Sequence, residues 1–349
     1  MTVRSDLQSA VDEADPGGVV CVEPGTYDGP LTIDVENLTV RSAEYRGAVI
    51  DGEGTSSAVT IEADGVTVER FEVTNPDGLL GVTVGRGYDG VTIRKNMVTD
   101  VGPTGRLGVT GILVGQGDHD EITIANNVVQ NLDQETTAES RFPTVNGILF
   151  DADNDAPGVL TNTVVNNNTI RDLESDVAPL GPVLQHETDG VVVNNNRIRG
   201  LTAADDTDAD PSDEVDFPFT FAQGINIASP STAETVVNHN VIEDVTSAET
   251  IRPEAVKIDG DGGGVTFRAN QFLVAIGLNN RNGTDGGARD PSGDPVVDAK
   301  NNWWGRRSGP EEAAFNQAAD DDGRSDVVGN VDAEPFLRNP PGRPGAGRP

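Results

Sequence analysis

The sequence is poor in cysteine, aromatic residues and lysine. It has one cysteine, Cys21, among 349 residues, which excludes an intrachain disulfide. Aromatic residues make up 4% of the chain, so an apolar core must consist mainly of Val, Ile and Leu, which suit strands. No apolar stretch approaches the ~20 residues of a membrane-spanning helix. The opening residues, MTVRSDLQSA, also lack the apolar segment of a signal peptide.

Charge of one sign dominates the chain. It carries 24 basic and 58 acidic residues, a net charge of -34, and its lysines are Lys95, Lys257 and Lys300. A surface this acidic repels itself at low salt, and 1 M salt screens the repulsion within ~3 Å. The composition resembles that of haloarchaeal proteins that work in concentrated salt. No run of basic residues is present to neutralise phosphates, so we do not expect a nucleic-acid partner.

Internal repeats organise most of the sequence. Each repeat contains three short segments in which apolar residues alternate with period two, the pattern of strands with one buried face. An Asn recurs between the second and third segments, at a bend where its amide can hydrogen-bond the next Asn ~4.8 Å away. Phe71 occupies this position in an earlier repeat, so an apolar residue should begin the ladder. The recurring residues are Asn96, Asn127, Asn168, Asn196, Asn240, Asn270 and Asn302.

These repeats and the opening LQSAVDEADPGGVVCVEPGTYDGPLTID (7–34) resemble the right-handed parallel β-helix of the pectate-lyase-like superfamily, in a haloarchaeal type. The resemblance implies an all-β fold of three-strand coils with an Asn ladder and an N-terminal capping helix. We expect a single domain over 1–337, in which 306–337 covers the C-terminal end. The Pro/Gly-rich tail, 338–349, is expected to be disordered. Trp304, two residues after Asn302, should pack inside the closing coil.

The long segments between repeats fall on one side of the expected solenoid. They join the third strand of one coil to the first strand of the next, and insertions on one side of a solenoid commonly build its binding face. The resemblance implies a substrate groove along the first strands, between these segments. The segments are 102–110, 133–146, 174–182, 202–223 and 246–254.

Strand alternation predicts which residues of the first strands face outward. It places ionisable side chains on the outer face of the middle coils. Because such groups can transfer protons or hold a sugar carboxylate, we predict a site there. The predicted catalytic residues are Asp151, His186, Lys257 and Asp259, and the predicted substrate-binding residues are Asn226, Arg141 and Arg252.

Calcium is the one cofactor that the residues favour. It takes six to eight oxygen ligands, largely from carboxylates. His, Cys and Met are few and scattered, which argues against copper and zinc. The predicted calcium ligands are Asp151, Asp153, Asp155 and Asp259.

Two enzyme classes are compatible with this face, and neither is required by it. A polysaccharide lyase needs a base to remove the proton α to a sugar carboxylate, a role for Lys257 or Arg252. An inverting glycoside hydrolase needs two carboxylates ~6.5–9.5 Å apart, whereas Asp151 and Asp259 should lie three coils, roughly 14 Å, apart. Motifs of pectate lyases and polygalacturonases are absent, so catalysis is left open.

The resemblance and the outward residues together predict a polysaccharide-binding protein. We expect an extracellular or cell-surface β-helix protein that binds an acidic polysaccharide or cell-surface glycan along its first strands, with cleavage as an open question. The alternative is a noncatalytic structural or adhesive solenoid module of a haloarchaeal surface protein. A cytoplasmic location also stays open.

Overall fold

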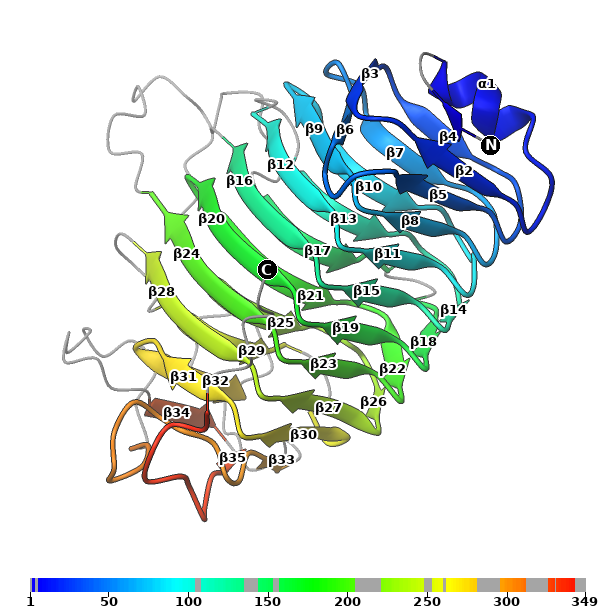
Figure 1. Cartoon of the computed structure of the whole chain (residues 1–349). Coiled ribbons are helices and arrows are strands. Elements are labelled where there is room, and N and C mark those ends of the chain that lie inside the picture. Colours follow the sequence, from blue (N-terminus) through cyan, green and yellow to red (C-terminus); the bar gives the residue numbers. More distant parts are fainter. Residues whose placement is uncertain are drawn as a thin grey trace.

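The chain folds into a solenoid of parallel strands (Figure 1). The structure, a computed structural model, describes residues 2–3, 6–103, 108–134, 144–152, 157–204, 221–247, 253–259, 262–280, 296–311, 326–329 and 331–342. Strands distant in sequence pair in parallel, coil after coil, which confirms the predicted all-β right-handed parallel β-helix. Within the described part of the chain, no helix is long and apolar enough to cross a membrane.

The first sheet collects the first strand of each coil. Its inward residues are Val and Ile over most of its length, and they are fully buried in one continuous core. This sheet presents the face on which the sequence predicts the site. Its strands are β4 (Leu31–Ile33), β7 (Ser57–Ile61), β10 (Leu80–Val84), β13 (Val109–Val114), β17 (Thr144–Phe150), β21 (Ala178–Leu184), β25 (Gln223–Ile227), β29 (Glu254–Ile258), β32 (Ile276–Asn280) and β34 (Asp326–Gly329).

A column of glycines lies where the chain enters the first sheet. A Cβ on Gly81 would lie 2.4 Å from Val98 Cγ1, and one on Gly224 would lie 2.4 Å from Ile242 Cγ2. These glycine positions therefore point toward third-strand side chains in the core, and the next residue along each strand also points inward. Two successive inward residues shift the alternation by one position at the start of each of these strands.

The second sheet contains the second strand of each coil. Its inward Val and Ile residues pack against the first sheet, and Thr residues occupy many of its outward positions. Its strands are β1 (Thr2–Val3), β2 (Val19–Val22), β5 (Thr39–Ser42), β8 (Thr67–Glu69), β11 (Thr92–Arg94), β15 (Thr123–Ala125), β19 (Val164–Asn166), β23 (Val192–Asn194), β27 (Thr235–Asn238), β30 (Val265–Arg268), β33 (Val297–Asp298) and β35 (Val331–Asp332).

The third sheet contains the third strand of each coil, and a short additional sheet follows the first sheet in four coils. The additional sheet was not predicted, because its strands have only two or three residues each: β14 (His119–Asp120), β18 (Val159–Thr161), β22 (Glu187–Asp189) and β26 (Thr232–Ala233). The strands of the third sheet are β3 (Gly25–Asp28), β6 (Ala48–Asp51), β9 (Glu72–Pro76), β12 (Met97–Gly102), β16 (Val128–Gln134), β20 (Thr169–Ser175), β24 (Arg197–Ala203), β28 (Val241–Ser247) and β31 (Gln271–Leu273).

The Asn ladder forms at all seven predicted positions, between the second and third sheets. Asn168 shows the pattern: its backbone N and its Nδ2 donate to Asn196 Oδ1 at 2.9 and 3.1 Å, and its Nδ2 also donates to Ile124 O at 2.8 Å. Phe71, which is fully buried, begins the stack, and its backbone N donates to Asn96 Oδ1 at 2.9 Å. The ladder thus satisfies buried backbone groups as well as its own amides.

Each end of the solenoid has an additional element. Helix α1 (Leu7–Asp12) begins after the N-cap Asp6, which accepts a hydrogen bond from Ser9 N, and the helix packs on β2 and β4. This confirms the predicted capping helix. At the other end Trp304 is fully buried, with its ring centroid 4.9 Å from that of Phe272. Residues 343–349 of the tail lie outside the described ranges, so the expected disorder of the tail stays a prediction.

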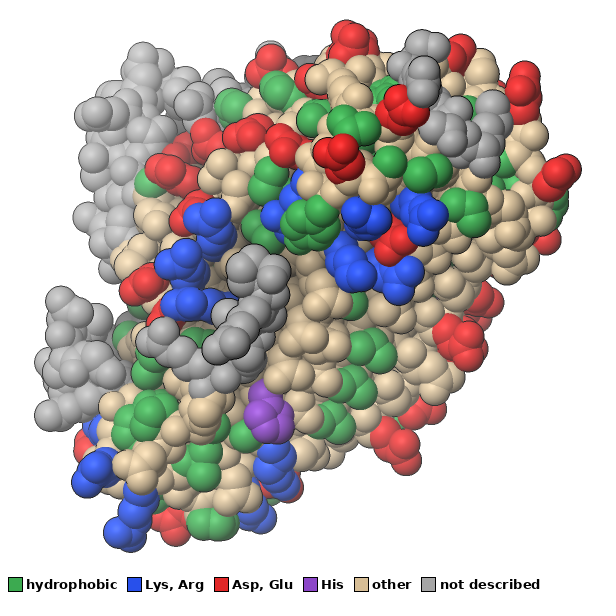
Figure 2. All heavy atoms as spheres, in the orientation of Figure 1, with side chains coloured by type: hydrophobic (Ala, Val, Ile, Leu, Met, Phe, Trp, Pro, Cys, Tyr) green, Lys and Arg blue, Asp and Glu red, His purple; other side chains and the backbone are tan. Residues whose placement is uncertain are grey.

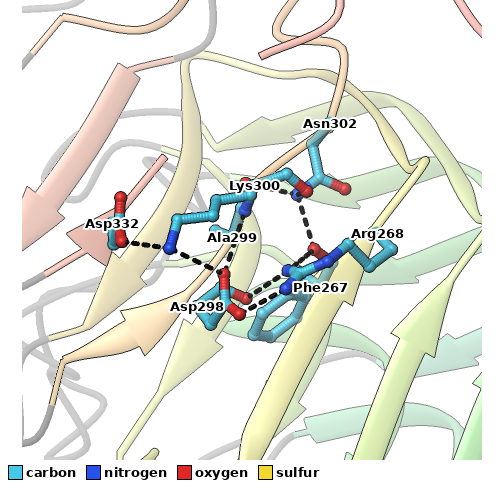
Figure 3. A network of polar contacts seen from close by, with 7 residues as sticks. All are labelled: Phe267, Arg268, Asp298, Ala299, Lys300, Asn302 and Asp332. Atoms are coloured by element: carbon cyan, nitrogen blue, oxygen red, sulfur yellow. Dashed lines mark hydrogen bonds and ion pairs between the residues drawn. The ribbon is translucent and has the colours of Figure 1, made fainter. Parts of the chain in front are cut away.

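Polar contacts hold the last coils together (Figure 3). Arg268 pairs with Asp298, and Lys300 Nζ lies 2.6 Å from Asp332 Oδ2. The bond from Arg268 holds the pKa of Asp298 below its usual value, and the bond to Asp332 raises the pKa of Lys300. Asn302, the last ladder residue, donates from Nδ2 to the carbonyl oxygens of Phe267 and Ala299.

Candidate functional site

The outward face of the first sheet changes character along the solenoid. In its central column, small or apolar residues occupy the earlier coils and polar residues occupy the later ones. The change falls between β21 and β25, so a polar ligand would find its partners in the later coils. The column, in register, is Thr83, Leu113, Leu149, Val183, Asn226, Lys257 and Asn279.

Six polar side chains from three adjacent coils form the candidate site, which we call the polar cluster. Parallel pairing of β25, β29 and β32 stacks these coils one above the other. Burial removes most of the cluster from water, and only Asp259 is more than one-tenth exposed. The residues are Gln223 and Asn226 from β25, Glu254 and Lys257 from β29, Asp259 directly after β29, and Asn279 from β32.

One end of the polar cluster is built around Asp259. Lys257 Nζ lies 3.3 Å from Asp259 Oδ1, and Asn226 Nδ2 donates to Asp259 Oδ2 at 3.1 Å. The same Nδ2 donates to Gln223 Oε1 at 2.6 Å. Both hydrogens of the Asn226 amide are therefore used, which fixes the orientation of the amide.

The other end is built around Glu254, which is 2% exposed. Gln223 Nε2 donates to its Oε2 at 2.9 Å, and Asn279 Nδ2 donates to its Oε1. Burial raises the pKa of Glu254 to about 7, although the nearby Lys257 charge and the amide bonds partly offset that rise. A carboxyl group with this pKa can take up and release a proton near neutral pH.

Two hydrogen-bond acceptors in the polar cluster are left without donors. Asn226 Oδ1 and Asn279 Oδ1 are buried, and neither has a hydrogen-bond partner among the described residues. Lys257 lies between them in register, one coil from each. The cluster thus offers two carbonyl oxygens and, between them, a side chain that carries a cation.

The structure corrects the predicted position of His186. Leu184 pairs with the inward Phe150, so Gln185, and not His186, takes the place beside Asp151. His186 is fully buried, with its ring centroid 5.7 Å from that of His119. Burial and the neighbouring His119 lower the pKa of His186 to about 4. The predicted outward position of His186 is therefore wrong, because the register of β21 differs by one residue from the one expected. Its catalytic role stays a prediction.

Asp151 lies on the outward face, but away from the polar cluster. Its column continues through Gln185 and Ala228 to Asp259, so three coils, roughly 14 Å, separate the two carboxylates. They do not converge on one ion. No group of three or more His, Cys, Asp or Glu residues suited to a metal occurs in the described ranges. Asp153 and Asp155 lie outside those ranges, so the calcium site stays a prediction.

The structure brings together part of the predicted site and adds to it. Asn226, Lys257 and Asp259 meet in the polar cluster. Arg141 and Arg252 lie outside the described residues, so their predicted role in binding stays a prediction.

The other three members of the polar cluster, Gln223, Glu254 and Asn279, were not predicted. Strict alternation from Asn226 and Lys257 would turn Gln223 and Glu254 inward. In the structure, two successive residues of each strand point inward at the glycine column, and this shift turns Gln223 and Glu254 outward. A Gly or Ala directly before the alternating apolar residues, as at Gly224 and Ala255, is the sequence signal that could have indicated the shift.

No protein-family model and no curated protein matches the sequence. Solved structures do match. Alginate lyase from Paenibacillus sp. str. FPU-7 has a TM-score of 0.55 at 16% identity, covering 95% of this chain and 99% of that one. Pectate lyase Pel9A has a TM-score of 0.51 at 15% identity, covering 95% of this chain and 73% of that one.

A third structural neighbour is the tailspike protein of E. coli bacteriophage HK620, in complex with a pentasaccharide. Its TM-score is 0.50 at 14% identity, covering 95% of this chain and 63% of that one. At such identities the likeness shows the fold alone. The structural neighbours are parallel β-helix proteins of the pectate- and alginate-lyase-like kind.

Proposed function

We propose that the protein binds an acidic polysaccharide along the outward face of the first sheet, with the polar cluster as the main contact. The observation that carries this proposal is the pair of buried acceptors, Asn226 Oδ1 and Asn279 Oδ1, which lack donors among the described residues. An unmet buried acceptor is costly, and a ligand that donates a hydrogen bond would remove that cost. Sugar hydroxyls are such donors.

Lys257 favours an acidic sugar over a neutral one. It lies in register between the two amides and is 7% exposed, so a sugar carboxylate beside it would meet a largely desolvated cation. The structural neighbours include proteins named as lyases of alginate and pectate, which supports a ligand of this class. The proposal includes an extracellular or cell-surface location, because such polysaccharides lie outside cells.

Cleavage of the bound chain is the second candidate function, and Glu254 is the observation that favours it. Its pKa of about 7 suits proton transfer at neutral pH. In a β-elimination, a base removes the proton α to the sugar carboxylate, and a cation such as Lys257 stabilises the negative charge that develops. The bond from the β carbon to the glycosidic oxygen then breaks as a carbon–carbon double bond forms, and a proton from water completes the hydroxyl group of the leaving sugar. Binding without cleavage would instead indicate a noncatalytic, adhesive solenoid module.

Calorimetric titration with uronate oligosaccharides tests the binding proposal. The titration is run in at least about 1 M salt, where the acidic surface is screened within ~3 Å. Unsaturated-uronate absorbance and new reducing ends report lyase and hydrolase activity in the same samples. We expect Asn226→Leu with Asn279→Leu to weaken binding about tenfold or more, because both acceptors are lost.

Thr83→Val is the matched control, because Thr83 occupies the same outward column in an earlier coil. It should bind like the wild type. The proposal would be overturned if the control and the double variant lost affinity equally. It would also be overturned if the wild type bound no uronate oligosaccharide.

A further inference from the structure

Basic side chains gather at the bend between the second and third sheets, away from the first sheet. Figure 2 shows them on the face that β5, β8 and β11 form with β6, β9 and β12. We call this group the basic corner. Its residues, from three consecutive coils, are Arg41, Arg46, Arg70, Arg94 and Lys95.

Backbone pairing stacks three of these cations in a row. Arg46 N donates to Arg70 O at 2.7 Å, and Arg70 N donates to Arg94 O at 3.3 Å. Arg46, Arg70 and Lys95 all adopt a left-handed conformation at the bend, with φ of 58°, 70° and 59°. Neighbouring coils lie ~4.8 Å apart, so like charges are stacked where they repel one another.

Acidic residues do not balance the basic corner. The segments 39–49, 67–73 and 92–98 contain five basic and three acidic residues, in a chain with a net charge of -34. Of the acids, Glu69 is buried and lies 2.8 Å from Arg94 Nε. Arg41, Arg70 and Lys95 have no ion-pair partner within the described residues.

An exposed aromatic ring lies beside the cations. Arg46 Cζ lies 4.8 Å from the ring centroid of Tyr45, whose exposed fraction is 56%. Arg46 Nη2 donates to Asn96 O at 3.3 Å, which orients the guanidinium, and its buried Nε has no partner among the described residues. A flat ring next to oriented cations suits a sugar ring that carries an anionic group.

We propose that the basic corner binds a short segment of an anionic polysaccharide through its sulfate or carboxylate groups, along the solenoid axis. The row of cations crosses three coils, roughly 10 Å, which fits a chain and not a single small anion. A row of this length is too small for a stable interface with another protein, which buries about 800 Å² on each side. The basic corner is separate from the polar cluster, so binding can be lost at one of the two sites and kept at the other.

The test compares two triple variants with the same change in net charge. Arg41→Gln, Arg70→Gln and Lys95→Gln remove the unpaired cations of the corner. The control substitutions remove three exposed cations elsewhere: Arg86→Gln, Arg307→Gln and Arg338→Gln. Binding of chondroitin sulfate, polygalacturonate, dextran and single-stranded DNA oligomers is measured from about 0.1 M to about 1 M salt.

The corner variant should bind the sulfated or carboxylated oligosaccharide about tenfold more weakly at low salt, with a salt-dependence slope smaller by about 2. The control variant should retain the affinity of the wild type for the sulfated oligosaccharide. Equal losses of affinity in both triple variants would show that net charge alone causes the effect, and would overturn the proposal. Equal or tighter binding of DNA, or binding of dextran, would overturn the assigned ligand class.

Discussion

The Asn ladder and the polar cluster are both stacks of buried polar side chains, and they differ in how completely they are satisfied. In the ladder, each amide from Asn96 to Asn270 donates to the next Asn and to a backbone carbonyl. In the polar cluster, Asn226 and Asn279 donate from their amides but leave both carbonyl oxygens without donors among the described residues. The ladder amides are thus satisfied within the chain, whereas the two amides of the cluster are satisfied only in part.

This difference separates a structural stack from the proposed binding surface in physical terms. A satisfied buried network stabilises the fold, and removing one member leaves its partners unpaired. An unsatisfied network already carries a cost, so removing an unpaired acceptor relieves part of it. Substitutions in the ladder should therefore lower stability more than binding. Substitutions in the polar cluster should lower binding more than stability.

Breaking the ladder should have the largest effect on stability. Asn168→Leu removes the Oδ1 that accepts from Asn127 N and the Nδ2 that donates to Ile124 O, at 2.9 and 2.8 Å. Each buried backbone group left unpaired costs ~1–3 kcal/mol, so the free energy of unfolding should fall by about 4 kcal/mol in urea titrations. Asn166→Leu, on the outer side of the second sheet, is the control and should change stability by less than about 1 kcal/mol.

Glu254→Gln should change how stability depends on pH. The folded pKa of about 7 lies above the reference value of 4.5, so the folded protein binds the proton more tightly than the unfolded chain. The stability that this group contributes is therefore fully present below pH 4.5 and is lost as pH rises through 7. Relative to the wild type, the variant should gain about 3 kcal/mol in free energy of unfolding between about pH 4 and about pH 8. Parallel pH curves would contradict the environment assigned to Glu254.

The two buried histidines repeat the comparison on a smaller scale. His119 has both ring nitrogens 2.8 Å from carbonyl oxygens, of Tyr88 and Gly115, and a neutral imidazole can donate to one of the two. The ring nitrogens of His186 have no partner in hydrogen-bond geometry among the described residues. At about pH 8, His119→Phe should therefore lower the free energy of unfolding by about 2 kcal/mol and His186→Phe by less than about 1 kcal/mol. Urea titrations of both variants at this pH provide the measurement, and equal losses would contradict the difference between the two rings.

The pH dependence of His186 provides a second measurement. Its folded pKa of about 4 lies below the reference value of 6.5, so the stability that it contributes is present above pH 6.5 and is lost as pH falls toward 4. His186→Phe should abolish that acid-dependent loss of stability, which amounts to about 3 kcal/mol. Thermal unfolding of both proteins across this range measures it, and an unchanged acid dependence would contradict the burial of a neutral imidazole.

The repeats predicted the fold well because period-two alternation and the recurring Asn are local signals. The ladder positions, the apolar start at Phe71 and the inward Trp304 all followed from spacing within a repeat. The site followed less well, because outward registers depend on where each strand gains an extra inward residue. That shift hid Gln223 and Glu254, and a one-residue error in register misplaced His186.

Asn226→Leu should have the smallest effect on stability and a large effect on binding. The substitution loses two hydrogen bonds, to Gln223 and Asp259, but it also removes an acceptor that has no donor among the described residues, so the net change should stay within about 1 kcal/mol. Lys257 keeps its contact with Asp259 in the variant. Binding of uronate oligosaccharides should weaken severalfold while the urea midpoint barely moves. A large loss of stability with unchanged binding would instead place the polar cluster with the ladder, as part of the structural core.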